Sequence, residues 1–261
     1  GRYFVGLFLD RIKYEALRLG SKSTFDLTKS EKKIVNEVSK TGYSYVPDFC
    51  DSALLTSLIT SVKAHFASPK PEFTYKADTR HYGIEQKLPE TEFFSESSML
   101  RNIGNSVMSR PICNLFTLGN HLIAGNNGSS GGGWHRDSMQ PQFKALMYLT
   151  DVNESNGPLQ IIPGTHKFIK LKKLQNLGLL KYNQQWLEDD EIEAIEEYLK
   201  SSRITITGKA GTLVVFKSNT LHRGKPIEIG ERIALTNYYY PTNSKFGPIL
   251  ENFGLSNNSI V

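Results

Sequence analysis

Residues 128–138 read GSSGGGWHRDS, so a run of glycines leads directly into a histidine, an arginine and an aspartate. A phosphate-binding loop would need Gly-Lys-Ser/Thr before a helix, whereas these glycines lead through Trp134 and His135 towards a strand. A protein-kinase catalytic loop is excluded as well, because its asparagine would fall at Gln142 and no DFG or VAIK sequence occurs. We therefore expect the glycines to form a flexible approach to a strand that carries metal ligands.

The spacing His135-x-Asp137 is the first sign of a metal site. In an extended segment residues two apart face the same side, so His135 and Asp137 converge while Arg136 faces the other way. A surface histidine beside a solvated aspartate would show the same spacing. His222, in the turn-forming SNTLHRG after the apolar strand TLVVF, adds a second imidazole. Two histidines and one carboxylate are typical of non-haem Fe(II) oxygenases, because this triad leaves adjacent metal positions open for a co-substrate and O₂.

Arg232 opens the segment RIALTNYYY, whose period of two places Arg232, Ala234 and Thr236 on one face of a strand. Tyr238 and Tyr240 continue that face. A buried guanidinium is costly without an anionic partner, and its planar fork suits a carboxylate. The alternative is an exposed arginine at a strand end. Together with the histidines, the pattern favours an anionic ligand at Arg232.

Composition limits the class of protein. The chain has 261 residues, of which 39% are hydrophobic and 22% charged, as in ordinary globular proteins. No apolar run approaches the roughly 18 residues that cross a membrane, and the net charge of +5 includes no dense basic block that would indicate a nucleic-acid partner. Cys50 and Cys113 are too few for a disulfide scaffold and show no metal-ligand spacing, so a cytoplasmic, reducing setting is expected. The mildly basic charge fits an anionic small-molecule partner.

The periodicity changes along the chain. A helical period predicts helices over residues 4–19, 30–41, 53–66 and 95–110, so the first 110 residues or so are mainly helical. A period of two then predicts strands over 113–124, 143–152, 159–164, 203–207, 212–216 and 232–240. An insertion at about 165–202, with a helix near 188–200, is long enough to be a lid or a binding wall. We expect one domain over 1–261: a mainly β sandwich or barrel, core about 111–241, with flanking helices.

Several segments together resemble the phytanoyl-CoA dioxygenase family of Fe(II)/2-oxoglutarate oxygenases. They are WHRD (134–137), NGPLQIIPGTHK (156–167), LHRG (221–224), GERIALTNYYYP (230–241) and GYSYVPDFCDSALLTSLI (42–59). The resemblance covers roughly residues 40–241. It implies a double-stranded β-helix (jelly roll, cupin-like) in which His135, Asp137 and His222 bind iron and Arg232 binds the distal carboxylate of 2-oxoglutarate.

The resemblance also implies a reaction. O₂ and 2-oxoglutarate would be converted with release of succinate and CO₂, and a C–H bond of a small or medium-sized, in some cases anionic, metabolite would be hydroxylated. Members often carry Ser or Thr two residues after the distal histidine, where this chain has Gly224; Thr236 is the expected substitute beside Arg232. Related halogenases replace the carboxylate ligand with a small residue, so Asp137 favours hydroxylation.

Further positions are expected near these groups. Asn120 either reaches the co-substrate from inside the barrel or closes a turn. The candidates for substrate contact are Arg80, His81, Tyr82 and Tyr148. No separate acid or base is expected beside the metal. The alternatives from other classes are a non-catalytic metal-binding protein, such as a cupin-like sensor or sugar-binding module, and a metallohydrolase.

Overall fold

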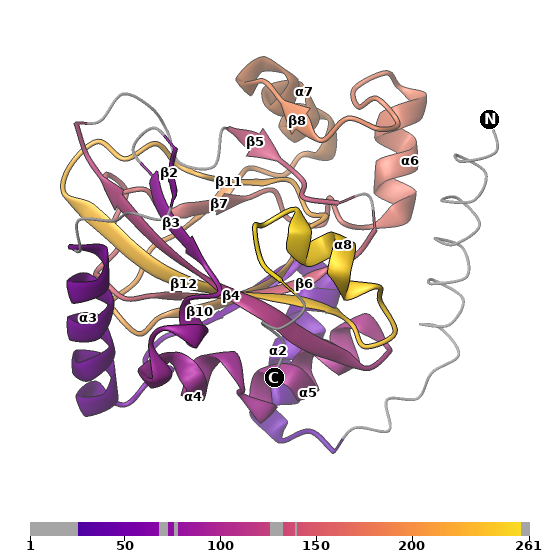
Figure 1. Cartoon of the computed structure of the whole chain (residues 1–261). Coiled ribbons are helices and arrows are strands. Elements are labelled where there is room, and N and C mark those ends of the chain that lie inside the picture. Colours follow the sequence, from indigo (N-terminus) through magenta and orange to yellow (C-terminus); the bar gives the residue numbers. More distant parts are fainter. Residues whose placement is uncertain (1–25, 68–72, 76–77, 126–132, 139, 257–261) are drawn as a thin grey trace.

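The computed structural model describes residues 26–67, 73–75, 78–125, 133–138 and 140–256 (Figure 1). The helix predicted over residues 4–19 and the glycine stretch 126–132 lie outside the described residues. The expected flexible approach to the ligand strand therefore stays a prediction.

The N-terminal helices begin and end where their capping residues place them. Helix α2 (Lys29–Thr41) starts at a capping box, in which Thr28 and Glu31 each bind the other's backbone N–H, and it ends at Gly42 with φ of +99°. Asp51 accepts from two backbone N–H groups at the start of α3 (Ser52–Phe66). Ser97 accepts from the backbone N–H of Leu100 at the start of α5 (Ser98–Met108). All three helices lie where the periodicity predicts them.

The strands form two antiparallel sheets, and the described chain has the double-stranded β-helix fold with flanking helices that was predicted (Figure 1). The larger sheet has the order β1 (Tyr43–Val46), β10 (Leu213–Lys217), β6 (Phe143–Tyr148), β12 (Glu231–Pro241), β4 (Ile112–Ile123), β3 (Asp78–Tyr82), β2 (Phe73–Tyr75). The smaller sheet has the order β8 (Trp186–Leu187), β5 (Trp134–His135), β11 (His222–Gly224), β7 (Leu159–Ile161), β9 (Ile204–Ile206).

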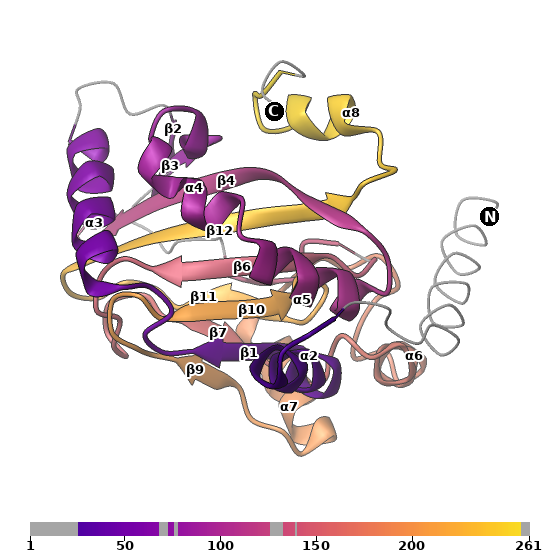
Figure 2. The same cartoon turned by 90° about the horizontal axis from the view of Figure 1, so that it is seen from below.

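Alternation along the strands divides the larger sheet into an outer face and an inner face. The outer residues pack against α2, α3, α5 and the short helix α4 (Glu92–Ser95), which Figure 2 shows lying across this face. Examples on the outer face are Ala145 and Met147 of β6, and Ile233 and Leu235 of β12. The intervening residues point between the two sheets, and they include Arg232, Thr236 and Tyr238 of β12 and Lys144 of β6.

The insertion has a small core of its own. It contains α6 (Phe168–Asn176), strand β8 and α7 (Asp189–Leu199), and its buried apolar side chains pack with Trp134 and Leu221 of the jelly roll. Helix α7 lies where a helix was predicted near 188–200, whereas α6 was not predicted. The chain continues after β12 into α8 (Phe246–Glu251), which was not predicted either.

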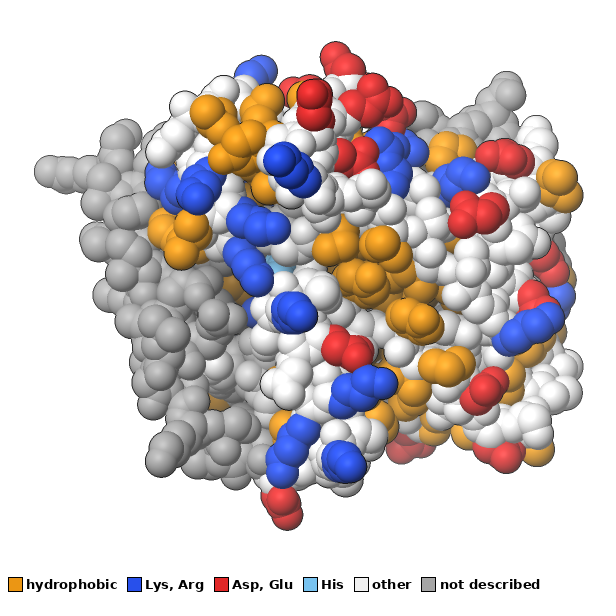
Figure 3. Space-filling model, turned by 180° about the vertical axis from the view of Figure 1, so that it is seen from behind, with side chains coloured by type: hydrophobic (Ala, Val, Ile, Leu, Met, Phe, Trp, Pro, Cys, Tyr) orange, Lys and Arg blue, Asp and Glu red, His pale blue; other side chains and the backbone are white. Residues whose placement is uncertain are grey.

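Within the described ranges, no helix is both long enough and apolar enough to cross a membrane. Figure 3 shows the face opposite that of Figure 1, where basic, acidic and hydrophobic side chains lie interspersed.

Candidate metal centre and cavity

The structure brings His135, Asp137 and His222 together between the two sheets. Each offers one ligand atom, and these atoms lie within 4.8 Å of one another. Strands β5 and β11 pair directly at His135 and His222. The Asp137 carboxylate lies between the two rings, with Oδ1 3.6 Å from His135 Nε2 and Oδ2 3.5 Å from His222 Nε2.

Backbone carbonyls orient both imidazoles. The Nδ1 atom of His135 lies 2.9 Å from the carbonyl oxygen of Gly133, and that of His222 lies 2.8 Å from the carbonyl oxygen of Thr220. Because a carbonyl only accepts, each Nδ1 carries a hydrogen, which leaves Nε2 of each ring as the atom that can bind a metal. Two such nitrogens and one carboxylate oxygen form the 2-His-1-carboxylate facial triad, a ligand set that binds divalent transition metals such as Fe(II).

The charges of these groups are those that metal binding requires. Burial, reinforced by the proximity of His135, lowers the pKa of His222 to about 3, so this ring is neutral at pH 7. Burial alone would raise the pKa of Asp137, but the Lys144 ammonium outweighs it, helped by His222 and His135, and holds that pKa well below its usual range. Since metal ligands must be deprotonated, this site needs little rearrangement of protons to bind an ion.

The turn before His222 is fixed by close contacts with two other segments. The hydroxyl of Thr165 accepts from the backbone N–H of Leu221 at 2.9 Å. Gly42, at the end of α2, approaches so closely that a Cβ there would lie 2.6 Å from Thr220 Oγ1. The glycine is therefore needed for its positive φ and for the space it leaves beside the turn that positions His222.

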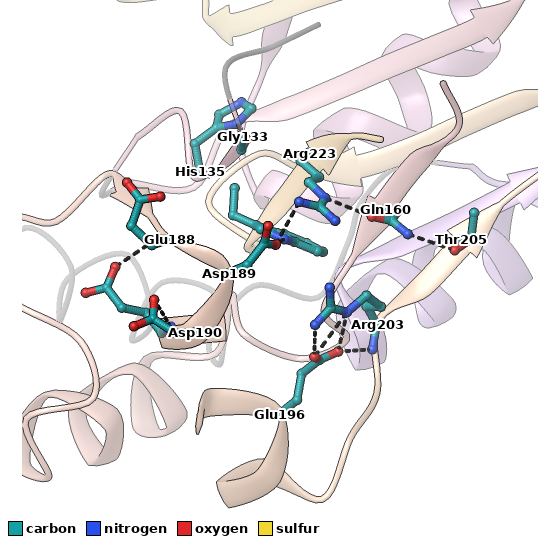
Figure 4. A network of polar contacts seen from close by, with 12 residues as sticks. Gly133, His135, Gln160, Glu188, Asp189, Asp190, Glu196, Arg203, Thr205 and Arg223 are labelled. Carbon is teal, nitrogen blue, oxygen red and sulfur yellow. Dashed lines mark hydrogen bonds and ion pairs between the residues drawn. The ribbon is translucent and has the colours of Figure 1, made fainter. Parts of the chain in front are cut away.

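The insertion contacts both ligand strands. Strand β8 pairs with β5, and the Trp186 ring lies 4.8 Å from the His135 ring, centroid to centroid. Asp189 Oδ1, at the start of α7, accepts from the Trp134 indole N–H at 3.0 Å and from Arg223 Nη1 at 2.8 Å. Since Trp134 precedes His135 and Arg223 follows His222, one carboxylate of the insertion is connected to both strands (Figure 4).

Arg223 and Arg203 extend this network (Figure 4). The guanidinium of Arg223 lies 4.7 Å from the centre of the Trp134 ring, and that of Arg203 lies 5.3 Å from it. Arg223 Nε also donates to Gln160, which donates to Thr205. Arg203 forms an ion pair with Glu196 of α7. Arg136 is turned towards the insertion too, where its Nε donates to the carbonyl oxygen of Gln184 at 2.9 Å.

A cavity of about 550 Å³ opens beside the three ligands. This volume lies within the roughly 300–1,000 Å³ of typical small-molecule sites. Residues of both sheets, of the insertion and of the C-terminal segment line it. Among them are Asp78, Arg80, Tyr82, Asn120, Gln142, Lys144, Trp186, Gly224, Arg232, Ala234, Thr236, Tyr238, Tyr240 and Phe253.

Arg232 is buried in this cavity with an exposed fraction of 6%. Its Nη2 donates to Asn120 Oδ1 at 2.8 Å and its Nη1 donates to the carbonyl oxygen of Gly157, while Nε is buried without a partner. Burial lowers the pKa of Arg232. Among the described residues no carboxylate forms an ion pair with it, so the guanidinium is left with neutral acceptors only. This environment is suited to binding an anion.

Asp78 connects Arg232 to the wall of the cavity and was missed in the sequence. Its Oδ1 accepts from the Asn120 amide, and its Oδ2 accepts from Arg80 Nε at 2.7 Å. Strand β3 was not predicted because Asp78, Arg80 and Tyr82 all point into the polar cavity, so the strand lacks an apolar face on that side. The alternate polar positions Asp78, Arg80 and Tyr82 were the pattern that could have indicated a strand facing a polar cavity.

The remaining predicted positions divide into two groups. Thr236, Arg80 and Tyr82 line the cavity, as does Gly224. His81 points the other way, with its Nδ1 against His65 of α3.

Tyr148 does not line the cavity either, because its hydroxyl is held inside the core. This hydroxyl donates to the carbonyl oxygen of Ile206 at 2.9 Å and accepts from the backbone N–H of Leu159 at 3.0 Å. The geometry therefore gives no support to substrate contact by His81 or Tyr148, since period two turns the first outwards and backbone groups occupy the second.

Lys144 and Trp186 are the other residues that sequence reasoning missed. Lys144 lies on the inner face of β6, with Nζ 3.0 Å from Asp137 Oδ2 and 3.7 Å from the centre of the Tyr238 ring. A single lysine within the apolar segment FKALMYL was a signal for a buried, paired charge. Nothing in the local pattern around Trp186 indicated that it would reach His135.

Comparison of the sequence with known proteins gives one family and several partial relatives. The profile of the Phytanoyl-CoA dioxygenase (PhyH) family matches residues 39–228. The ectoine dioxygenase of Bordetella parapertussis is 34% identical over 96 residues, which are 34% of this chain and 31% of that protein. That of Sphingopyxis alaskensis is 30% identical over 97 residues, again 34% of this chain and 31% of the relative. The matches thus span about a third of the length of these relatives.

Solved structures share the fold at low sequence identity. EctD from S. alaskensis with 2-oxoglutarate and 5-hydroxyectoine superposes with a TM-score of 0.65 at 15% identity, over 84% of this chain and 80% of that one. The non-haem α-ketoglutarate-dependent epimerase SnoN from nogalamycin biosynthesis gives 0.60 at 15% identity, over 81% and 83%. Because the family profile covers well over half of its length, the chain belongs to the phytanoyl-CoA dioxygenase family.

Proposed function

We propose that this protein is an Fe(II)- and 2-oxoglutarate-dependent dioxygenase that hydroxylates an unactivated C–H bond of a small or medium-sized, anionic metabolite. The observation that carries the proposal is the pairing, in one cavity, of the His135–Asp137–His222 cluster with a buried Arg232 that lacks an anionic partner. The three-residue cluster fits the metal, and the buried arginine fits one carboxylate of a dicarboxylate co-substrate.

His135, Asp137 and His222 would hold the iron. When bound, Fe(II) supplies the Lewis acidity and the electrons that O₂ activation requires. The partial relatives are ectoine dioxygenases, and EctD from S. alaskensis holds 2-oxoglutarate in its structure, which supports this metal and this co-substrate. The carbonyl oxygens at Gly133 and Thr220 keep the two rings in the tautomer that presents Nε2.

Arg232 would bind the distal carboxylate of 2-oxoglutarate, and Asn120 would hold the guanidinium in place. The unpartnered Nε and the neutral acceptors at the other nitrogens leave this arginine without a direct anionic partner until the co-substrate binds, because the Asp78 carboxylate is separated from it by Asn120. Thr236, which lines the same cavity, takes the place of the missing hydroxyl at Gly224. The products would be succinate, CO₂ and the hydroxylated metabolite.

A non-catalytic metal-binding sensor or sugar-binding module explains less of the site. Such a protein gains nothing from a buried, uncompensated guanidinium, which destabilises the fold unless it serves a ligand. A metallohydrolase would need a separate general base in the cavity. Asp78 is engaged with Asn120 and Arg80, so this carboxylate is not free for that role.

The test is succinate release from 2-oxoglutarate, with a +16 mass product sought in a metabolite extract. The wild type should release succinate only when Fe(II) is present, and Asp137→Ala should abolish the release. Asp151→Ala is the matched control, because Asp151 forms an exposed ion pair with Lys209 and does not line the cavity. Full succinate release by Asp137→Ala would refute the proposed function.

A further inference from the structure

We propose that the substrate is a monoanion, and that Lys144 and Gln142 bind its anionic group at the end of the cavity away from Arg232. This inference rests on the proposed function, since it concerns the space that iron and 2-oxoglutarate leave free. It assigns a substrate class to the site and names two specificity-determining residues.

Lys144 and Arg232 lie at separate places along the cavity. Lys144 pairs across the sheet with Tyr238, which lies six residues after Arg232 on the same strand. Six residues of extended chain span about 20 Å. The two cations therefore serve different groups: Arg232 suits the distal carboxylate of the co-substrate, whereas Lys144, 3.0 Å from Asp137, lies where a substrate near the metal would be.

Gln142 adds a neutral donor beside Lys144. Residues 142 and 144 share the inner face by alternation, and both line the cavity. The Gln142 side-chain oxygen accepts from Ser218 Oγ at 3.1 Å, which fixes the orientation of the amide. Its Nε2 is buried, with the Tyr240 hydroxyl close by but no hydrogen bond of good geometry. A buried donor next to an ammonium forms a receptor for a carboxylate, because the two groups can each donate to one of its oxygens.

The charges of the loaded site leave one positive charge to neutralise. The two positive charges of Fe(II) balance the two negative charges of 2-oxoglutarate. Asp137 balances Lys144, and Asp78 balances Arg80 through its ion pair, so the charge of Arg232 remains in excess. Arg136 is left out of this balance because its guanidinium is turned away from the three metal ligands and towards the insertion, where it donates to the carbonyl oxygens of Gln184 and Tyr182. Since uncompensated buried charge is costly, a substrate with a single negative charge binds best.

Aromatic side chains define the rest of the substrate site. Tyr82 and Tyr238 both pack against Phe253, with ring centroids 5.0 Å and 5.8 Å from it. All three line the cavity, as does the half-exposed Trp186. Such walls suit an apolar body. The substrate class that fits is a compact monocarboxylate with an apolar or ring-containing body.

The experiment compares a carboxylate with its neutral amide. The protein is loaded with Zn(II), which has no redox chemistry, and with 2-oxoglutarate. Binding of 4-fluorobenzoate and of 4-fluorobenzamide is then followed by ¹⁹F NMR. We expect the wild type to prefer the carboxylate by at least about tenfold, as one charge-assisted contact provides. Lys144→Met should remove the preference, and Lys144→Arg, which keeps the charge, should retain most of it.

Gln142→Glu provides an independent test that leaves the Lys144–Asp137 ion pair in place. The added carboxylate would occupy the receptor, so the preference should reverse in favour of the amide. Equal binding of the two probes to the wild type, no binding of either, or a carboxylate preference that survives Lys144→Met would overturn the proposal.

Zn(II) and 2-oxoglutarate affinities are measured on the same samples. If Lys144→Met bound 2-oxoglutarate much more weakly than the wild type, Lys144 would belong to the co-substrate site and the proposal would be wrong. If the wild type failed to bind 2-oxoglutarate with any metal, the proposed function would fail instead, and the charge balance with it.

Discussion

Replacing Arg232 by methionine should have opposite effects on co-substrate binding and on stability. In the loaded protein this guanidinium would form a buried pair with a carboxylate of 2-oxoglutarate, and removing one partner of such a pair costs about 3–5 kcal/mol. The dissociation constant of 2-oxoglutarate should therefore rise roughly 140- to 4,000-fold, at 1.4 kcal/mol for each factor of ten.

The free protein should tolerate the same change well. Methionine leaves Asn120 Oδ1 and the carbonyl oxygen of Gly157 without their donor, at about 1–3 kcal/mol each. It also removes a buried, uncompensated charge, whose desolvation costs several kcal/mol. The two contributions are of similar size, so the free energy of unfolding of Arg232→Met should lie close to that of the wild type or above it.

Two measurements check this pair of effects. Calorimetric titration of 2-oxoglutarate into the Zn(II)-loaded protein gives the affinity, and urea unfolding of the free protein gives the stability. Arg101→Met is the matched control, because Arg101 forms an exposed ion pair with Glu96 and should change neither quantity by much. A 2-oxoglutarate affinity of Arg232→Met within tenfold of the wild type would refute the reasoning, as would a large loss of stability.

Three further changes have expected outcomes. Tyr148→Phe should lower the free energy of unfolding by about 2–4 kcal/mol, because two buried backbone groups lose their partner; calorimetry checks this, and unchanged stability would contradict it. Asp189→Ala should weaken Zn(II) binding by about three- to tenfold, whereas Asp190→Ala should not, because only Asp189 contacts the residues beside both histidines. Equal Zn(II) affinities of the two variants would show that the insertion does not support the metal ligands. Free-protein stability should fall as pH drops from 6.5 towards 3, since His222 has a pKa of about 3 when folded against 6.5 when unfolded and only the unfolded chain takes up the proton. His222→Gln should flatten that pH dependence of the urea midpoint, and an unchanged slope would count against the burial argument.

The parts of the fold with strong periodic signals were predictable from the sequence. Helices α2, α3 and α5 carry capping residues and apolar faces, and β6, β10 and β12 carry apolar outer residues that pack on them. The metal ligands could be proposed because His135, Asp137 and His222 lie on or beside extended segments, in which residues two apart face the same side. The family resemblance connected these segments before any geometry was known.

What could not be predicted depends on contacts between distant segments. Strand β3 has a polar inner face, so its alternation resembles a loop although it supplies Asp78 and Arg80 to the cavity. Strand β8 has only two residues and forms by pairing with β5. The role of Lys144 follows from its 3.0 Å distance to Asp137, seven residues away in sequence, which no local pattern specifies. His81 was assigned with its neighbours because the strand that turns it outwards was not recognised.

The central claim is that the His135–Asp137–His222 cluster and Arg232 together bind one iron and one 2-oxoglutarate. Anaerobic titration of 2-oxoglutarate into the Fe(II)-loaded protein, followed by metal-to-ligand absorption, tests it most directly. We expect one 2-oxoglutarate per iron and no such absorption in His222→Ala, with succinate formed when O₂ is admitted. Saturable 2-oxoglutarate binding that needs no metal, or wild-type iron affinity in a variant lacking all three ligands, would contradict it.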